Sequence, residues 1–302
     1  MKIIDNRGRW DSLEEWHPAE HGAHDTFLLT RFNLKMCWHT KSGLDSRSDK
    51  WLQQRMELFA DYCWPSVRQQ TCGDFMWLCL LADDTPQCHV DRLETLAREC
   101  RQMVIVMMDE EEGRRHREMV TTIIDHVRKP GHAVITLRVD NDDILRNDFI
   151  ERARGYAQRQ EENMVMYWFA DGLQLYSKER KVFSLCYGRN QFPFLVNRVC
   201  RNGDPTILSY SHAAPETSCV KRVIRDGRPM WMENVHDDNV VNDVMFTTRQ
   251  RPFGMCGAMY DAFLPAVRRD ICTRWYHVLT FLVPRMARQF CVRLARKLSR
   301  RS

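Results

Sequence analysis

The sequence predicts an α/β protein: a single domain with a mostly parallel central sheet, mixed strands in the second half, and a C-terminal basic helical tail. Apolar, strand-like runs alternate with amphipathic helical patterns through the first half of the 302 residues. Strand-like pieces then follow one another closely, and the last part of the chain is rich in arginine. Alternation of strand and helix favours parallel pairing, and a change of pattern favours mixed additions to the sheet.

Four apolar runs in the first half are predicted as buried strands, at residues 24–34, 75–84, 103–109 and 133–140. Helical spacing of apolar residues lies between them, at residues 49–65, 90–100 and 115–127. The first helix is expected to stop at Pro65, since proline interrupts a helix interior. Parallel strands connected in this way bind ligands at their carboxyl ends.

The second half begins with a predicted helix over residues 142–158, which has Leu145 and Phe149 on its apolar face. Three strand-like segments follow, at residues 165–177, 181–188 and 191–199. No internal repeat or long linker divides the chain. We therefore predict one domain over residues 1–259 and a basic amphipathic tail over residues 260–302.

Composition leads us to expect a cytoplasmic protein. No apolar run approaches the roughly 18 residues of a membrane-spanning helix, and the first residues include acids but no apolar signal core. The 12 cysteines form no CxxC pair, and several lie inside apolar runs, which is typical of reduced thiols. Residues 260–302 carry a net charge of +8, so residues 1–259 sum to −3. This distribution argues against a nucleic-acid partner.

An acidic cluster follows the fourth predicted strand, where Asp140, Asn141, Asp142 and Asp143 come directly after the apolar run. Carboxylates one residue apart can share a divalent cation, and Mg²⁺ or Mn²⁺ prefers oxygen ligands. Such a site would hold a diphosphate and stabilise its charge as it leaves. The alternative is that Asp142 or Asp143 only caps the helix that follows.

A second polar stretch, residues 229–243, combines an aromatic residue, a histidine and several carboxylates. His236 could complete the metal shell, and Trp231 could offer a flat surface to a sugar or a base. The alternative is an irregular surface loop whose acids are solvated.

Other polar residues near strand ends are candidates for substrate contacts. Arg31 and Asn33 follow the first strand and could meet a base or a phosphate, although a structural ion pair explains Arg31 equally well. Asp83 and Asp84 end the second strand, and Asp171 could simply begin a turn. The chain has no GxGxxG, GxxxxGK, GxSxG or HExxH motif. Their absence argues against dinucleotide oxidoreductases, P-loop NTPases, α/β serine hydrolases and zincins.

The tail places Met286, Phe290, Leu294 and Leu298 at helical spacing among many arginines. A basic amphipathic helix of this kind can lie on an anionic leaflet, which would make the protein peripheral on the inner membrane face. The alternative is a terminal helix that packs on the domain and keeps a solvated basic face.

Ordered segments of the chain resemble the rhamnosyltransferase family, which belongs to the nucleotide-sugar-dependent glycosyltransferases of GT-A fold. The matching segments are residues 27–34 (FLLTRFNL), 51–83, 135–143 (ITLRVDNDD) and 231–239 (WMENVHDDN). The likeness keeps the same order over most of residues 24–245 and leaves out the residues after about Tyr260. It implies a GT-A-like single domain.

The resemblance also implies roles for individual residues. Asp140 and Asp142 would hold a divalent cation against the diphosphate of a sugar donor, and His236 would be a late metal ligand. An inverting enzyme also needs a carboxylate base near the acceptor hydroxyl. The candidates for this catalytic base are Asp171, Glu233 and Asp238, with Asp83 and Asp84 also open. The substrate-binding candidates are Arg31, Asn33, Asp83, Asp84, Asp140, Asn141, Trp231 and Asn239.

We therefore expect a metal-dependent glycosyltransferase that moves a sugar, with rhamnose as one candidate, from a nucleoside-diphosphate donor to a glycan or lipid-linked acceptor. Mn²⁺ or Mg²⁺ is the expected cofactor. One alternative is a metal-dependent phosphohydrolase that uses the same carboxylates to activate water. The other is a noncatalytic membrane-surface assembly protein in which the basic tail is the functional part.

Overall fold

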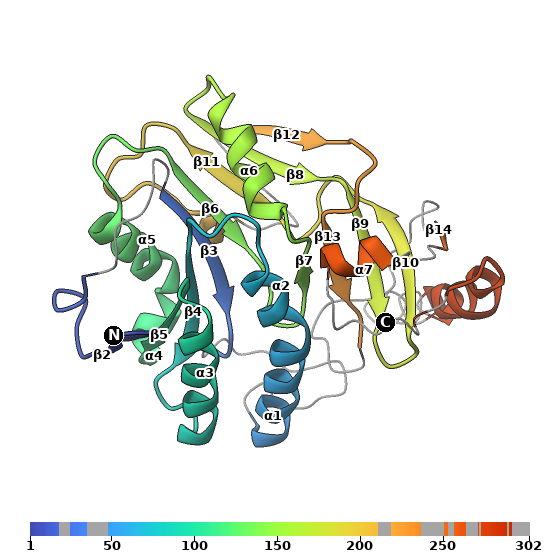
Figure 1. Cartoon of the computed structure of the whole chain (residues 1–302), viewed down its shortest axis with the longest axis horizontal. Helices are drawn as coiled ribbons and strands as arrows, with labels where there is room; N and C mark the ends of the chain where they lie inside the picture. Colours follow the sequence, from blue (N-terminus) through green and yellow to red (C-terminus); the bar gives the residue numbers. More distant parts are fainter. Residues whose placement is uncertain are drawn as a thin grey trace, which may run out of the picture.

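The computed structural model shows an α/β molecule built around one large and one small sheet (Figure 1). The structure describes residues 1–17, 25–34, 48–210, 219–236, 251–252, 257–263, 271, 273–288 and 290–291. Within these residues, no helix is both long enough and apolar enough to cross a membrane.

The larger sheet has nine strands in the order β12-β8-β11-β6-β3-β4-β5-β1-β2. Their bounds are β1 Lys2–Asp5, β2 Gly8–Trp10, β3 Asp25–Arg31, β4 Met76–Ala82, β5 Met103–Met108, β6 Val134–Arg138, β8 Met164–Phe169, β11 Phe194–Asn197 and β12 Val220–Ile224. Among these strands, β11 and β1 run against the other seven. The prediction of a mostly parallel central sheet is therefore confirmed.

The strand order reverses in the middle of this sheet. β3, β4 and β5 lie side by side in chain order, and the chain then returns to place β6 on the other side of β3. A crevice for a ligand opens at the carboxyl ends of the strands at such a switch point. The chain leaves β3 at residues 32–34 and β6 at residues 139–143, so these two segments line the switch point.

Helices cover both faces of the larger sheet (Figure 1). On one face lie α1 (Asp49–Leu58), α2 (Trp64–Arg68), α3 (Gln87–Glu99) and α6 (Phe149–Gln158), which share a core with Leu28 and Trp77. On the other face lies α5 (His116–Val127), which shares a second core with Leu29 and Leu78. Neighbouring residues of one strand belong to opposite cores because strand side chains alternate between faces. The shorter α4 (Glu110–Arg114) and η2 (Ile207–Ser209) lie in connections.

The smaller sheet has the order β14-β10-β9-β13-β7. Its strands are β7 Ile144–Leu145, β9 Asp171–Tyr176, β10 Lys181–Cys186, β13 Trp231–Asn234 and β14 Arg251–Pro252. β13 pairs antiparallel with β7 and parallel with β9. Because β7 follows the acidic turn (residues 140–143) and β13 leads to His236, this pairing joins two segments that are distant in the sequence.

Two helix predictions differ from the structure. The helix at residues 49–65 continues beyond Pro65 to Arg68, through a wider π-helical turn, η1 (Phe59–Cys63). Pro65 lies in the first turn of α2, where a missing backbone N–H costs little. The helix predicted from residue 142 begins only at Phe149, and Leu145 lies in β7 opposite Trp231.

One strand prediction also differs, and one hairpin was missed. The strand at residues 165–177 divides at Ala170 into β8 and β9, which belong to different sheets. The hairpin β1-β2 extends the edge of the larger sheet through β5 and was not predicted.

The described part of the tail contacts the smaller sheet. Leu282 of η3 (Val278–Leu282) is buried in a cluster with Tyr176 and Phe183. Phe263 of α7 (Gly257–Phe263) is buried in a separate cluster that includes Met232. The tail helix is drawn in red beside β10 (Figure 1). The division between residues 1–259 and 260–302 stays a prediction, and Leu294 and Leu298 lie outside the described residues.

Candidate functional site

The acidic turn after β6 lies at the switch point of the larger sheet. Asp142 and Asp143 are both buried within this turn. Oδ2 of Asp142 lies 2.9 Å from Nε2 of His236, which follows the carboxyl end of β13. The fold therefore brings together two residues that are 94 positions apart. This contact is what a cation shared by both side chains would require.

Arg55 of α1 is a third member of this cluster. Its Nη1 lies 2.5 Å from Oδ2 of Asp142 and donates to Oδ1 of Asn141 at 3.2 Å. The Arg55 guanidinium also stacks over the Trp51 ring, 5.1 Å from its centroid. The side chains of Arg55 and Asp142 are 7% and 5% exposed, so the ion pair is formed almost out of contact with water.

The two buried carboxyls have opposite electrostatic environments. Burial alone would raise the pKa of Asp142, but Arg55 and His236 together lower it below its usual range. Burial, reinforced by the charges of Asp142 and Asp140, raises the pKa of Asp143 well above its usual range. Asp143 is held by Nε2 of Gln191 at 3.1 Å and by the backbone N–H of Asn234 at 2.9 Å. Asp142 is therefore the ionised carboxylate of the pair, and Asp143 anchors the turn.

Asp140 faces two further arginines. Nη2 of Arg138 donates to its two carboxylate oxygens at 3.2 and 3.4 Å, and Nη2 of Arg31 lies 4.0 Å away. Burial lowers the pKa of Arg31, and the neighbouring charge of Arg138 lowers it further. Asp140 is the most exposed of these three side chains, at 35%. The turn thus combines acidic and guanidinium groups at one edge of the sheet.

Asn33 and Asn141 connect the segments of the switch point. Nδ2 of Asn141 donates to the carbonyl of Phe32 at 2.8 Å. Nδ2 of Asn33 donates to the Thr85 hydroxyl at 2.9 Å, and its Oδ1 accepts from the backbone N–H of Ala82 at 3.2 Å. Both amides are buried and hold the ends of β3, β4 and β6 together.

Asp83 and Asp84 lie at the carboxyl end of β4, beside β3, and both are exposed. The backbone N–H of Asp83 donates to the carbonyl of Met108 in β5. These two carboxylates therefore lie along the same edge of the sheet as the acidic turn, as the sequence predicts.

Three other candidates, Trp231, Asp171 and Glu233, have ring or hydrogen-bond partners of their own. Trp231 is a core residue: its ring stacks on Phe192 at 4.9 Å, and its indole N–H donates to Phe169 at 2.8 Å. This ring is therefore no free surface for a sugar. Asp171 begins β9, and its carboxylate accepts from the backbone N–H of Gly227, at the opposite end of β13 from His236.

Glu233 lies inside β13 and is buried, with Nε2 of Gln174 donating to its carboxylate at 2.7 Å. Asp238 and Asn239 lie outside the described residues. The capping alternative for Asp142 and Asp143 does not hold, because α6 begins six residues later and β7 intervenes.

The donor chemistry of the turn fits a divalent cation. Asp142 offers a carboxylate, His236 an imidazole nitrogen and Asp140 a second carboxylate. In the part of the chain that the structure describes, no three such side chains meet in a complete metal-binding group. Asp142 and His236 supply two candidate ligands, and non-protein oxygens would have to complete the shell; Oδ2 of Asp142 also contacts Arg55.

The sequence contains a pattern from which the buried position of Arg55 could have been predicted. Leu52, Arg55, Met56 and Phe59 share one helix face by their spacing, so a charged residue lies in an otherwise apolar stripe. A buried arginine requires an anionic partner, and the acidic turn provides it. Arg138 is similarly a charged end of an otherwise apolar strand.

The chain is an α/β protein with an acidic turn, bounded by arginines, at the switch point of its larger sheet. A family model described as "Putative rhamnosyl transferase" matches residues 45–248, which is more than half of the chain. The chain belongs to this family, which by its description is one of glycosyltransferases, and the resemblance seen in the sequence is confirmed.

Comparison with solved structures found crystal structures of S. aureus TarS. TarS 1-349 has 8% identity and a TM-score of 0.39, with 70% of this chain and 60% of that chain covered. TarS 1-349 in complex with UDP has 8% identity, a TM-score of 0.38 and the same coverage. The chain therefore spans about 60% of the length of these TarS structures. No curated protein matches the chain.

Proposed function

We propose that this protein transfers a sugar from a nucleoside-diphosphate donor to a glycan or lipid-linked acceptor, with rhamnose as a candidate sugar. The observation that carries the proposal is the contact of Asp142 with His236 at the switch point, in a chain of the rhamnosyl transferase family. Nucleotide ligands commonly bind at this place in an open α/β sheet.

We propose Mn²⁺ or Mg²⁺ as the cofactor, held by Asp142 and His236 with Asp140 nearby. When bound, the cation would stabilise the negative charge of the leaving diphosphate. Arg31 and Arg138 flank Asp140 and would attract the diphosphate to the same edge. Arg55 holds Asp142 ionised and oriented, although the side chain is buried.

The remaining substrate contacts are proposals of the same kind. Asn33 and Asn141 fix the loops around the donor, and the exposed Asp83 and Asp84 could accept hydrogen bonds from ribose or sugar hydroxyls. Asn239 lies three positions beyond His236 in the sequence and is kept as a donor contact.

We keep Asp171, Glu233 and Asp238 as the candidates for a catalytic base, which an inverting reaction would need. The variants Asp171→Asn, Glu233→Gln and Asp238→Asn separate them. Loss of turnover with unchanged donor binding in one variant identifies the base. Unchanged turnover in all three would exclude this set.

A thermal-shift screen tests the donor. UDP, GDP, dTDP and CMP are added to wild type and to Asp142→Asn, each with and without Mn²⁺, and Asp91→Asn on the exposed face of α3 is the control. A ligand at 100 times its Kd stabilises the folded state by about 2.7 kcal/mol. We expect one nucleotide to stabilise wild type and the control only with Mn²⁺. Equal stabilisation of Asp142→Asn would contradict the proposed role of Asp142.

A product assay, together with the thermal-shift screen, separates the alternatives. Donor cleavage to free sugar, with no product on any acceptor tested, would favour the phosphohydrolase. An absence of any nucleotide shift in wild type would favour the assembly protein and count against the proposed transfer.

We also propose that the tail contacts an anionic membrane. Its helix packs on the domain through Leu282 but exposes large apolar side chains. Trp275 is 71% exposed, Leu279 60%, Val283 46% and Phe290 59%, at helical spacing. Residues 260–302 add a net charge of +8, and each cation near an anionic surface contributes about 1 kcal/mol.

Vesicle sedimentation tests the membrane contact. Wild type is mixed with neutral phosphatidylcholine vesicles or with vesicles that contain phosphatidylglycerol, and Leu279→Glu is compared with Val199→Glu. Val199 is 58% exposed and lies outside the tail, so both variants add one charge at an exposed apolar site. We expect only Leu279→Glu to lose binding to anionic vesicles. Equal binding by both variants, or no binding by wild type, would contradict the membrane contact.

A further inference from the structure

A cavity lies beside the smaller sheet, and the acidic turn is not among its described lining residues. Its volume is about 430 Å³, and it is lined by Arg146, Asp226, Gly227, Arg228, Pro229, Met259, Ala262 and Phe263. The segment after β7, the turn between β12 and β13, and α7 form its described walls. None of the predicted metal or substrate residues is among the described lining residues.

The position of the cavity follows from the pairing of β7 and β13. The backbone N–H of Arg146 donates to the carbonyl of Met230 at 3.0 Å and extends the ladder beyond Leu145. Arg146 lies four positions after Asp142, so their Cα atoms are at most about 14 Å apart. Phe263 is buried against Ile144, between these two positions in the strand. The cavity is thus a neighbour of the proposed donor site and not a part of it.

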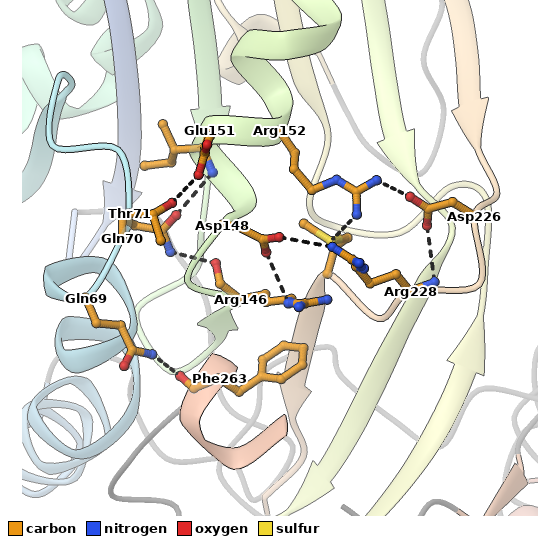
Figure 2. A network of polar contacts seen from close by, with 12 residues as sticks. Gln69, Gln70, Thr71, Arg146, Asp148, Glu151, Arg152, Asp226, Arg228 and Phe263 are labelled. Carbon is orange, nitrogen blue, oxygen red and sulfur yellow. Dashed lines mark hydrogen bonds and ion pairs between the residues drawn. The ribbon is translucent and has the colours of Figure 1, made fainter. Parts of the chain in front are cut away.

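Three arginines and two aspartates form a polar network (Figure 2), and three of them, Arg146, Arg228 and Asp226, line the cavity. Nε of Arg146 lies 3.1 Å from Oδ1 of Asp148, and Nη1 of Arg228 lies 3.5 Å from Oδ2 of the same carboxylate. Arg152 pairs with Asp226, whose other oxygen accepts from the backbone N–H of Arg228. These five side chains sum to one positive charge, and the carboxylate of Asp171, which accepts from the backbone N–H of the lining residue Gly227, lies beside them.

The guanidinium of Arg146 carries most of the unused hydrogen-bonding capacity. Its side chain is 19% exposed, and its single carboxylate contact among the described residues is the one from Nε to Asp148. That Nε and that Oδ1 are buried, and neither makes a well-aligned hydrogen bond within the described part of the chain. An arginine has five N–H donors in a planar fork that matches carboxylate or phosphate oxygens. Burial lowers the pKa of Arg146, and the charges of Arg228 and Arg152 act in the same direction.

The wall formed by α7 and Pro229, opposite the arginines, determines which ligand body the cavity can hold. Met259, Ala262 and Phe263 of α7, together with Pro229, present mainly apolar atoms to the cavity. α7 is held in place because the backbone N–H of Asn147 donates to Ala262 at 2.7 Å and the Gln69 side chain donates to Phe263. A ligand that fits both walls has an oxyanion at one end and a body with apolar faces, as a charged sugar has.

We propose that the cavity between Arg146, Arg228 and α7 is an anion-binding site for a phosphate or carboxylate group. The two arginines supply the N–H donors, and α7 supports the attached body. The site does not rest on the proposed glycosyl transfer. The bound anion is either a phosphoryl group or the carboxylate of an acidic sugar.

Isothermal titration calorimetry on the full chain tests the site with inorganic phosphate and with galacturonic acid, and galactose is the uncharged control. The variants are Arg146→Gln and Arg228→Gln. Arg68→Gln is the matched control, because Arg68 and Arg228 are 53% and 52% exposed and each makes one long carboxylate contact, at 3.8 and 3.5 Å. Arg228→Gln is expected to keep the fold even if Arg146→Gln is unstable, since its side chain is half exposed.

We expect at least one charged probe to bind wild type and Arg68→Gln, with affinity about tenfold weaker in each pocket variant. Binding of phosphate alone assigns the site to phosphoryl groups, and binding of galacturonic acid assigns it to acidic sugars. Failure of both probes to bind wild type, or equal binding by Arg228→Gln and Arg68→Gln, would overturn the proposal. Asp142→Asn is expected to bind the probe as wild type does, and this separates the cavity from the donor site.

Discussion

Replacing Arg55 with methionine removes the partner of a buried carboxylate and keeps most of the side-chain volume. Nη1 of Arg55 is 2.5 Å from Asp142, and both side chains are almost fully buried. Removing one member of a buried ion pair costs about 3–5 kcal/mol, because the other charge stays desolvated. The contact of His236 with Asp142 remains, so we expect the lower end, about 3 kcal/mol. At about 2 °C per kcal/mol for a chain of this size, Tm falls by about 6 °C.

Chemical denaturation in metal-free buffer measures this loss, and Arg68→Met is the control. Arg68 also lies over a tryptophan, Trp64, at 5.0 Å, but its carboxylate contact is exposed. Its variant should change stability by less than about 1 kcal/mol. The double variant with Asp142→Asn should be less unstable than the sum of the single variants, by about 1–3 kcal/mol. Additive losses, or equal losses for Arg55→Met and Arg68→Met, would refute the buried pair as the cause.

Further predictions concern packing and thiol chemistry. A Cβ at Gly172 would overlap the ring of Trp231, so Gly172→Ala should lower the free energy of unfolding by about 1–3 kcal/mol. Gly155→Ala in α6 meets nothing within 4 Å and should stabilise by up to about 1 kcal/mol, so a similar effect of both variants in urea denaturation would contradict the packing argument. Burial raises the pKa of Cys200 to about 11, and because the thiolate is the nucleophile, its alkylation rate should rise about tenfold per pH unit between pH 8 and 10. Mass spectrometry of iodoacetamide labelling measures this rate, and a rate at pH 8 equal to that of the exposed Cys88 would contradict it.

The elements with strong local patterns were predicted from the sequence. Buried parallel strands such as β4 are continuous apolar runs, and α3 and α5 have clear apolar faces. β7 was missed because two residues are too few to show the alternation of a strand. Its strand character comes from pairing with β13, which lies far away in the chain. The continuation of the helix beyond Pro65 was missed because the π-helical turn at residues 59–63, which places Pro65 in the first turn of α2, has no local sequence pattern.

The site was predicted only in part, because some of its residues follow local patterns and others depend on long-range packing. Asp142 was found because it ends an apolar strand, and its contact with His236 follows from the order of the segments in the fold. Trp231 looked like a ligand surface from its polar neighbours, but alternation in β13 turns its ring into the core beside Phe192. Arg55 could be placed only once α1 was known to cover the acidic turn.

The proposed function requires that Asp142 and His236 hold a divalent cation together with a nucleoside diphosphate. Electron paramagnetic resonance of free Mn²⁺ measures this directly, by titrating wild type, Asp142→Asn, His236→Asn and the control Asp91→Asn with Mn²⁺. Each titration is made with and without the nucleotide that stabilises the protein. We expect the nucleotide to tighten Mn²⁺ binding in wild type and in the control, and both site variants to lose this effect. Mn²⁺ binding that is equal in all four proteins, or that the nucleotide leaves unchanged in wild type, would contradict it.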